Sequence, residues 1–172
     1  MNESRVMLRS VTDVDSALLY AWITDRKLRI MNAPYRPTSE AQHRAWFNSI
    51  CQRHDVALFM IDEVLTGKTV GTCQLREIES INRSAELQIR IGDTRNHDRG
   101  LGTSAVEQLV QFGFEDLNLR RISLEVFSHN ERAIHVYEKC GFSIEGLLRE
   151  AVYVDGQWSD ITCMGILRGR ND

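Results

Sequence analysis

A strand, a glycine-rich loop and an amphipathic helix follow one another in the middle of the chain, and this succession limits the available folds. Residues 85–91 alternate apolar and polar side chains, as a half-buried strand does. The run Arg99-Gly100-Leu101-Gly102-Thr103 then opens a segment with apolar residues at helical spacing, and residues 121–127 alternate again. Strand, helix and strand in this order predict a parallel, right-handed βαβ unit.

The glycine-rich loop predicts an anion site. Gly100 and Gly102 allow a ligand to approach the backbone, and the free N–H groups and dipole of a helix start favour phosphate. The spacing matches neither the P-loop nor the three-glycine dinucleotide fingerprint. Two glycines before a helix are also ordinary turn chemistry, so a purely structural loop is the alternative.

Flanking segments complete an alternating pattern of strands and helices. We expect a strand at residues 6–9, and a helix that starts after Thr12 and ends between residues 25 and 29. The spacing of Ser39 and Gln42 predicts a capping box, and the helix it starts would bury Ala45, Trp46 and Ile50. Residues 56–61 and 69–75 read as an antiparallel hairpin.

The C-terminal third carries clear boundary signals. Asn130 is suited to cap a helix over residues 131–140, and Gly141 to stop it in a left-handed conformation. Asp155 and Gly156 indicate a type I′ turn between strands at residues 151–154 and 159–167.

Two motifs together resemble those of a known family. The run from His97 to Gly102 resembles a [QR]-x-x-G-x-[GA] pyrophosphate loop, and Asn130-x-x-Ala133-x-x-x-Tyr137-x-x-x-Gly141-Phe142 resembles the same family's second signature. The chain is similar to the GNAT superfamily of acetyl-CoA-dependent N-acetyltransferases, and residues 145–160 resemble its ribosomal-protein-alanine, spermidine and amino-sugar branch. His97 stands where the family usually carries Gln or Arg, so it is left out of the site.

The resemblance implies an α/β (α+β) fold: a mixed, mainly antiparallel sheet with helices on both faces and a splayed parallel strand pair. One N-acetyltransferase domain would span residues 1–172. The pantetheine arm of acetyl-CoA would insert between the splayed strands and meet mostly backbone groups. The implied cofactor contacts are Ile89, Ile91, Arg99, Gly100, Leu101, Gly102, Thr103, Asn130, Ala133 and Tyr137.

The implied reaction is direct attack of a neutral amine on the thioester. An ammonium must first lose a proton, and the departing thiolate must be protonated or stabilised. Tyr137 matches the family's acid position, although a helical tyrosine is often a packing residue. Glu86 is the first candidate base because its strand borders the acetyl site, and an ion-pair partner is its alternative role. Glu150 and Asp160 are further candidates for the base or for holding a cationic acceptor.

The acceptor stays open between a protein N-terminus, a polyamine and an amino sugar. A non-catalytic acyl-CoA-binding sensor that kept the cleft is the rival function, and an oligomerising structural protein is another. Absence of acetyl-CoA binding would favour the structural protein.

Composition and residue spacing limit the partners, metals and location that we expect for this protein. The chain has 172 residues, a net charge of −3 and no basic cluster, so we expect neither a nucleic-acid nor a membrane partner. Histidines and cysteines show no zinc spacing, so we expect no metal, and no long apolar run is present, so we expect a cytoplasmic protein. A homodimer through residues 165–172 and the last hairpin is compatible with the sequence, which does not determine it.

Overall fold

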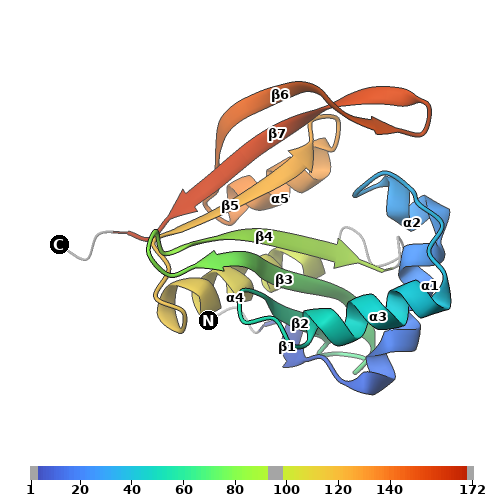
Figure 1. The fold of residues 1–172 in the computed structure, drawn as a ribbon. Helices are drawn as coiled ribbons and strands as arrows, with labels where there is room; N and C mark the ends of the chain where they lie inside the picture. Colours follow the sequence, from blue (N-terminus) through green and yellow to red (C-terminus); the bar gives the residue numbers. More distant parts are fainter. Residues whose placement is uncertain (1–3, 93–98, 170–172) are drawn as a thin grey trace.

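The computed structural model describes residues 4–92 and 99–169, which form one mixed sheet with helices on both faces (Figure 1). Within these residues the seven strands are ordered β1-β2-β3-β4-β5-β7-β6. The strands are β1 (Val6–Ser10), β2 (Ala57–Glu63), β3 (Thr69–Glu79), β4 (Ser84–Ile91), β5 (Arg121–Phe127), β6 (Ser143–Val154) and β7 (Gln157–Leu167). The helices are α1 (Ser16–Thr24), α2 (Arg26–Ile30), α3 (Glu40–Ile50), α4 (Leu101–Glu115) and α5 (Glu131–Lys139), preceded by a 3₁₀ turn at Asp13–Asp15.

The parallel pair predicted from the βαβ pattern is formed by β4 and β5. The two strands pair only over residues 84–86 and 121–123, and they separate farther along (Figure 1). Their outer edges are fully used, because β4 pairs with β3, and β5 pairs with β7 along its whole length. The predicted mainly antiparallel sheet with a splayed parallel pair is confirmed.

Adjacent residues of β2 show which helices cover which face. Ile61 packs in the larger apolar cluster with Leu109 of α4, whereas Met60 packs in the smaller one with Trp22 of α1 and Phe47 of α3. Successive residues of a strand point to opposite faces, so α4 covers one face and α1 to α3 the other. Leu87 belongs to the larger cluster, and the even-numbered residues of β4 therefore face α1 to α3.

The first helical segment differs from its prediction. A 3₁₀ turn follows Thr12, α1 begins at Ser16, and Asp25 interrupts the segment with an extended ψ of 109°. The Asp25 carboxylate then accepts hydrogen bonds from the N–H groups of Lys27 and Leu28 and starts α2. A short acidic side chain competes for backbone N–H groups in this way, which divides the helix.

The capping box of α3 is confirmed, and of the three residues predicted to be buried Ile50 is confirmed while Ala45 and Trp46 are wrong. The Ser39 N–H donates to Gln42 Oε1 at 2.9 Å, and the Gln42 N–H donates to Ser39 Oγ at 3.2 Å. The buried side chains are His43, Phe47 and Ile50, which recur at helical spacing, whereas Ala45 is exposed and Trp46 is 42% exposed.

The C-terminal hairpin is longer than predicted. Asp155 and Gly156 both have positive φ, 53° and 84°, which confirms the type I′ turn. β6 begins at Ser143, well before the predicted start. The sequence pattern did not show this early part, because register shifts near Ile144 and before Val152 interrupt the alternation by which a strand is recognised. The Asn130 cap and the left-handed Gly141 (φ 93°) are confirmed at the ends of α5.

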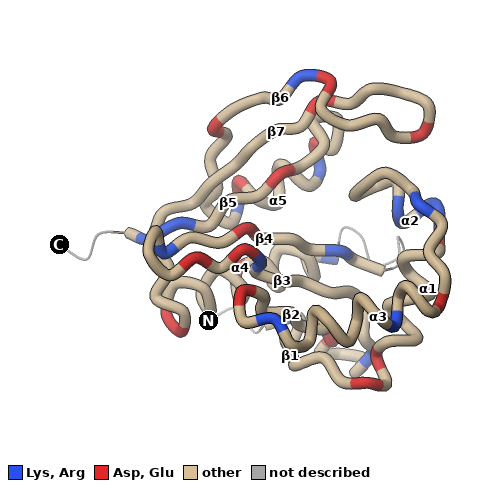
Figure 2. Tube along the Cα trace, in the orientation of Figure 1, with Lys and Arg blue, Asp and Glu red and all other residues tan. Residues whose placement is uncertain are grey.

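Charges are interspersed along the trace rather than gathered on one element (Figure 2). In the described part of the chain no helix is long and apolar enough to cross a membrane. No group of three His, Cys, Asp or Glu side chains among the same residues is placed to hold a metal ion. The four cysteines are free.

A partly buried ion-pair network links the N-terminal strand to the first helical segment. Arg9 of β1 donates to both carboxylate oxygens of Asp15 at 2.8 Å and to Asp62 of β2 at 2.7 Å. Asp15 is 5% exposed and also accepts from the N–H and hydroxyl of Thr12. The Arg9 hydrogen bonds, with those from Thr12, lower the pKa of Asp15 to about 2.

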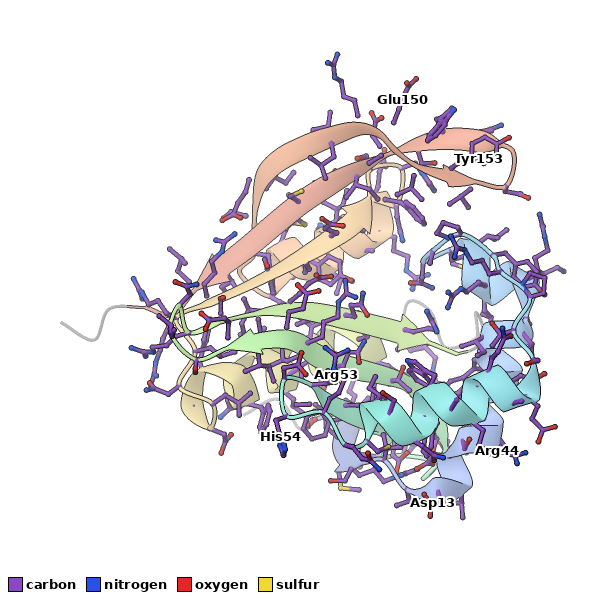
Figure 3. All side chains as sticks on the ribbon, in the orientation of Figure 1. Asp13, Arg44, Arg53, His54, Glu150 and Tyr153 are labelled. Atoms are coloured by element: carbon purple, nitrogen blue, oxygen red, sulfur yellow. The ribbon has the colours of Figure 1, made fainter. Side chains whose placement is uncertain are left out.

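Asp15→Asn should destabilise the protein at pH 7 by on the order of 2 kcal/mol, because a carboxylate whose pKa falls from 3.8 to about 2 on folding stabilises the native state. This contribution is complete above about pH 4 and is lost as the pH falls toward 2. Urea unfolding between pH 3 and 7 measures it. The exposed neighbour Asp13 (Figure 3) supplies the control Asp13→Asn, and an equal pH slope for wild type and Asp15→Asn would contradict the prediction.

Candidate active site

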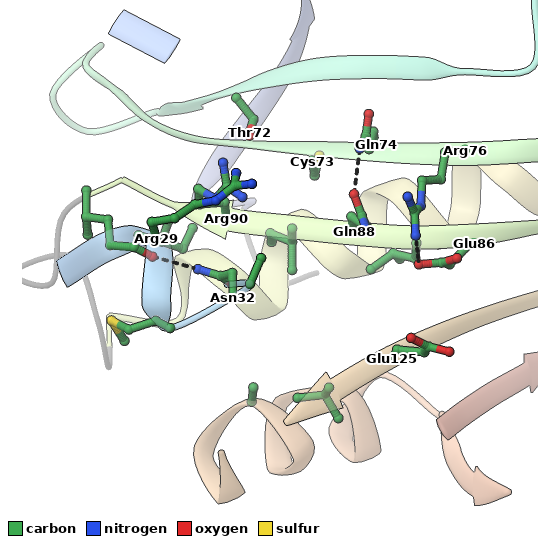
Figure 4. A pocket seen from close by; sticks show the side chains of 18 of the residues that line it. Arg29, Asn32, Thr72, Cys73, Gln74, Arg76, Glu86, Gln88, Arg90 and Glu125 are labelled. Atoms are coloured by element: carbon green, nitrogen blue, oxygen red, sulfur yellow. Dashed lines mark hydrogen bonds and ion pairs between the residues drawn. The ribbon is translucent and has the colours of Figure 1, made fainter. Parts of the chain in front are cut away.

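A cavity of about 770 Å³ passes through the sheet where β4 and β5 separate. On one face it is lined by Gly102 of α4 and Tyr137 of α5, and on the other by Arg29, His43 and Trp46 of the α1 to α3 side. Figure 4 shows the cavity between the polar side chains of β3 and β4 and those of β5. Two molecules can therefore enter from opposite faces and meet between the strands.

Polar side chains of β3 and β4 form a ladder along one wall of the cavity. Arg76 Nη2 donates to Glu86 Oε1 at 2.7 Å, and the side-chain amides of Gln74 and Gln88 are hydrogen-bonded at 2.7 Å (Figure 4). Glu86 thus has the ion-pair role that was its alternative, and it also lines the cavity. A side chain can hold both roles, because a carboxylate has two oxygens and four lone-pair sites.

Tyr137 of α5 lines the cavity and is largely buried. Tyr137 is 8% exposed, and its ring packs edge-on against the ring of Phe142, with 5.9 Å between the ring centroids. Its hydroxyl makes no hydrogen bond within the described residues. Burial, with a smaller contribution from Cys140, raises the pKa of Tyr137 to about 12, so the phenol is protonated at neutral pH and is able to donate.

The structure brings six of the expected cofactor residues to this one cavity. They are Ile89, Ile91, Gly102, Asn130, Ala133 and Tyr137. The Asn130 side chain is already used as a cap, since its Oδ1 accepts from the Ala133 N–H at 3.2 Å. A Cβ at Gly102 would meet no atom within 4 Å, so the space in front of this residue is open.

The remaining expected residues form the entry to α4. Gly100 has a left-handed φ of 73°, and a Cβ there would lie 2.9 Å from Arg5 Nη1. Arg5 also donates to the Arg99 carbonyl at 2.6 Å, and the Arg99 side chain is paired with Glu63. Leu101 is 2% exposed, so only its backbone can meet a ligand.

The first turn of α4 has the free donors that an anion site needs. The first intrahelical bond runs from the Ser104 N–H to the Gly100 carbonyl at 3.1 Å, which leaves the N–H groups of Leu101, Gly102 and Thr103 without intrahelical acceptors. His97 and Asp98, at the start of the resembling motif, lie outside the described residues.

The alternative acids are not brought to the cavity. The Glu150 N–H donates to Asp160 Oδ1 at 2.7 Å, which ties the two residues together across the β6–β7 hairpin, and neither lines the cavity. Figure 3 shows Glu150 and Tyr153 on this hairpin. The carboxylate that joins Glu86 at the cavity is instead Glu125 of β5 (Figure 4).

The cavity residues that were not in the predicted site include Glu125, Arg29, Arg90 and His43. Glu125 and Arg90 are polar residues of strands that alternate polar and apolar side chains. Such a residue can be recognised as part of a site only when the element that packs against its face of the sheet is known. His43 is 2% exposed, its Nε2 lies 2.9 Å from the Ser16 carbonyl, and its Nδ1 has no partner in the described structure. Its burial follows from the helical rotation that the sequence prediction got wrong.

Comparisons with known proteins agree with this arrangement. The sequence profile of the acetyltransferase (GNAT) domain matches residues 5–143. A crystal structure of spermidine N-acetyltransferase from Vibrio cholerae, in complex with CoA and spermine, superposes with a TM-score of 0.87 at 28% identity and covers 96% of both chains.

Sequence relatives point the same way. The spermidine N(1)-acetyltransferase of Vibrio cholerae is 37% identical over 101 residues, which are 59% of this chain and 58% of that protein, so the match spans little more than half of the relative. An uncharacterised N-acetyltransferase, p20 of Bacillus licheniformis, is 29% identical over 95% of this chain and 93% of its own. The profile match covers well over half of the chain and coincides with the splayed strands and the loop at α4. The chain belongs to the GNAT acetyltransferase family.

Proposed function

We propose that this protein is an N-acetyltransferase that moves an acetyl group from acetyl-CoA to a primary amine by direct attack in a ternary complex. The observation that carries the proposal is the cavity through the separated strands, which has Tyr137 on one side and Glu86 on the other. The related Vibrio structure holds CoA together with a polyamine, which supports an arrangement with two substrates bound at once.

Acetyl-CoA would bind from the α4 and α5 face. Its pyrophosphate would accept from the free N–H groups at the start of α4, and its pantetheine amides would pair with the unpaired edge of β4 near Ile89 and Ile91. Glu86 would take the proton from the ammonium, directly or through water. Tyr137 would donate its proton to the departing thiolate, and its high pKa keeps that proton available.

A non-catalytic acyl-CoA sensor is the alternative. It predicts acetyl-CoA binding without acceptor-dependent chemistry. A cytoplasmic location and a homodimer stay predictions.

The proposed function is tested by titrating the protein with acetyl-CoA in a calorimeter, then assaying free-thiol release with peptide, amino-sugar and polyamine acceptors. Binding with acceptor-dependent thiol release is expected. Binding of acetyl-CoA without thiol release from any acceptor would favour the sensor. Absence of acetyl-CoA binding would exclude both the acetyltransferase and the sensor.

Gly102→Leu should weaken acetyl-CoA binding at least about 10-fold while the free protein stays as stable or becomes slightly more so. The leucine side chain enters space that is open in the free protein, and leucine favours a helix over glycine by about 0.8 kcal/mol. Calorimetric titration and thermal unfolding measure the two effects separately. Unchanged affinity would mean that the cofactor does not approach this turn.

Tyr137→Phe should lower kcat by about 100-fold or more, the usual contribution of a positioned acid, with little change in acetyl-CoA affinity. The substitution removes only a hydroxyl that has no hydrogen bond within the described structure, so the melting temperature should be preserved. Steady-state kinetics and calorimetry check this result. A wild-type kcat with a good acceptor would exclude Tyr137 from the proton transfer.

Glu86→Gln should lower kcat by about 100-fold and remove the acidic limb of the pH–rate profile, because the base is lost. Arg76→Gln is the matched control: it breaks the same ion pair but keeps the Glu86 carboxylate. Kinetics of both variants from pH 5 to 9 separate the roles. Equal losses in the two variants would show that the ion pair, and not a base, is needed.

A further inference from the structure

Arg90 lines the cavity and has no counterion among the described residues. It lies near the C-terminal end of β4 on the face toward α1 to α3, and it forms no ion pair within the described residues. Its Nε is buried and has no hydrogen-bond partner there. Burial, with the nearby charge of Arg29, lowers the pKa of Arg90 to about 10, so the guanidinium is still charged at neutral pH. A buried and unpaired guanidinium is unfavourable unless a ligand supplies the anion.

A second arginine stands beside the first. Figure 4 shows Arg29 of α2 next to Arg90, and the only hydrogen bond of the Arg29 side chain within the described residues is a long one of 3.4 Å from Nε to the Pro34 carbonyl. Neither arginine has a carboxylate partner in the part of the chain that the structure describes. The two neighbouring like charges repel each other, and both are stabilised when an anion lies between them.

The other arginines of the cavity do not share this state. Arg53 is paired with Asp55, Arg76 is paired with Glu86, and Arg132, which also lines the cavity, is not free of interactions either. Figure 2 shows that α2 and the end of β4 both carry basic positions. The free positive charge of the described cavity is therefore concentrated at Arg29 and Arg90.

The acidic groups lie at the other end of the cavity. Glu86 is at the point where β4 and β5 cease to pair, and Glu125 lies on β5 across from it (Figure 4). Glu86 and Arg90 are four residues apart on one face of β4, which separates their Cα atoms by about 13 Å. The cavity thus has a carboxylate end near the reacting position and a guanidinium end on the α2 side.

From this charge distribution we infer that the amine acceptor carries an anionic group, a carboxylate or a phosphate, which Arg29 and Arg90 bind while its amine lies near Glu86. The inference rests on the proposed acetyltransferase function and names the class of its acceptor. The separation excludes a free amino acid, whose amine and carboxylate are too close together. An extended tripeptide spans about 10 Å from its amine to its carboxylate. A phosphorylated amino sugar likewise carries an amine and an anion on opposite sides of a rigid ring.

The same charges disfavour a plain polyamine. Its first ammonium would suit Glu86 and Glu125, but an extended chain would bring a second ammonium toward Arg29 and Arg90, where no described carboxylate compensates the repulsion.

Binding of the anion is tested on the whole protein saturated with CoA, so that the loop at α4 is already occupied. Inorganic phosphate is titrated while the arginine Nε–Hε signals are followed by nuclear magnetic resonance, and the Arg90 signal is assigned by its loss in Arg90→Gln. The Arg90 signal should shift to saturation, with the affinity at least about 5-fold weaker in Arg29→Gln. Arg44→Gln, on the exposed side of α3 (Figure 3), should match wild type. If the Arg90 signal does not shift on addition of phosphate, or if Arg29→Gln and Arg44→Gln bind phosphate with equal affinity, the inference is overturned.

Turnover then identifies the source of the anion. Thiol release is compared for trialanine and its C-terminal amide, for glucosamine 6-phosphate and glucosamine, and for spermidine. In at least one pair the anionic member should have a kcat/KM at least 10-fold higher than its neutral counterpart. Arg90→Gln should abolish this preference by raising the acceptor KM with little change in kcat, and Arg90→Lys should restore part of it.

Other outcomes separate the failure of the inference from that of the function. Preference for spermidine or for the neutral members, with thiol release intact, would overturn the anionic acceptor and leave the acetyltransferase standing. A rise in the acetyl-CoA KM alone in Arg90→Gln would assign the arginines to the cofactor. No thiol release from any acceptor, together with no acetyl-CoA binding, would remove the function itself.

Discussion

The separation of β4 and β5 is the constraint on which the rest of the site depends. Beyond residues 84–86 and 121–123 the facing edges of the two strands carry backbone groups with no partner in the ladder, while their outer edges remain paired with β3 and β7. Backbone N–H and C=O groups in an interior need hydrogen-bond partners, and an extended chain of amides is a suitable one. The opening of the sheet joins its two faces, and under the proposed function it is the slot for the cofactor.

Around this opening, the two faces contribute different chemistry. The α4 and α5 side supplies free helix N–H groups, the open space at Gly102 and the buried phenol of Tyr137. The α1 to α3 side supplies aromatic side chains and two arginines that have no carboxylate partner among the described residues, with carboxylates at the point where the strands part. This division fits a thioester that enters from one face and an amine that enters from the other.

Local signals in the sequence were reliable where a backbone conformation depends on a few neighbouring residues. The capping box at Ser39, the Asn130 cap, the Gly141 stop and the turn at Asp155 and Gly156 are all present, because each depends on local hydrogen bonds or on a positive φ. Errors arose where packing decides. The buried side of α3 was predicted with Trp46 instead of Phe47, because the direction of a helical stripe is fixed by the cluster around Met60 that it covers.

The sequence by itself determined the βαβ unit, the glycine-rich entry to a helix and the family, because these follow from periodicity and from two short motifs; it also predicted six residues that the structure brings to one cavity. Only the tertiary structure decided which charges meet at the cavity. Asp160 accepts a hydrogen bond from the Glu150 backbone N–H in a hairpin away from the cavity, while Glu125, Arg29 and Arg90, far apart in the chain, converge on the opening. The physical reason is that a side chain's electrostatic environment is set by elements that the fold brings against it, and spacing along the chain carries no record of them.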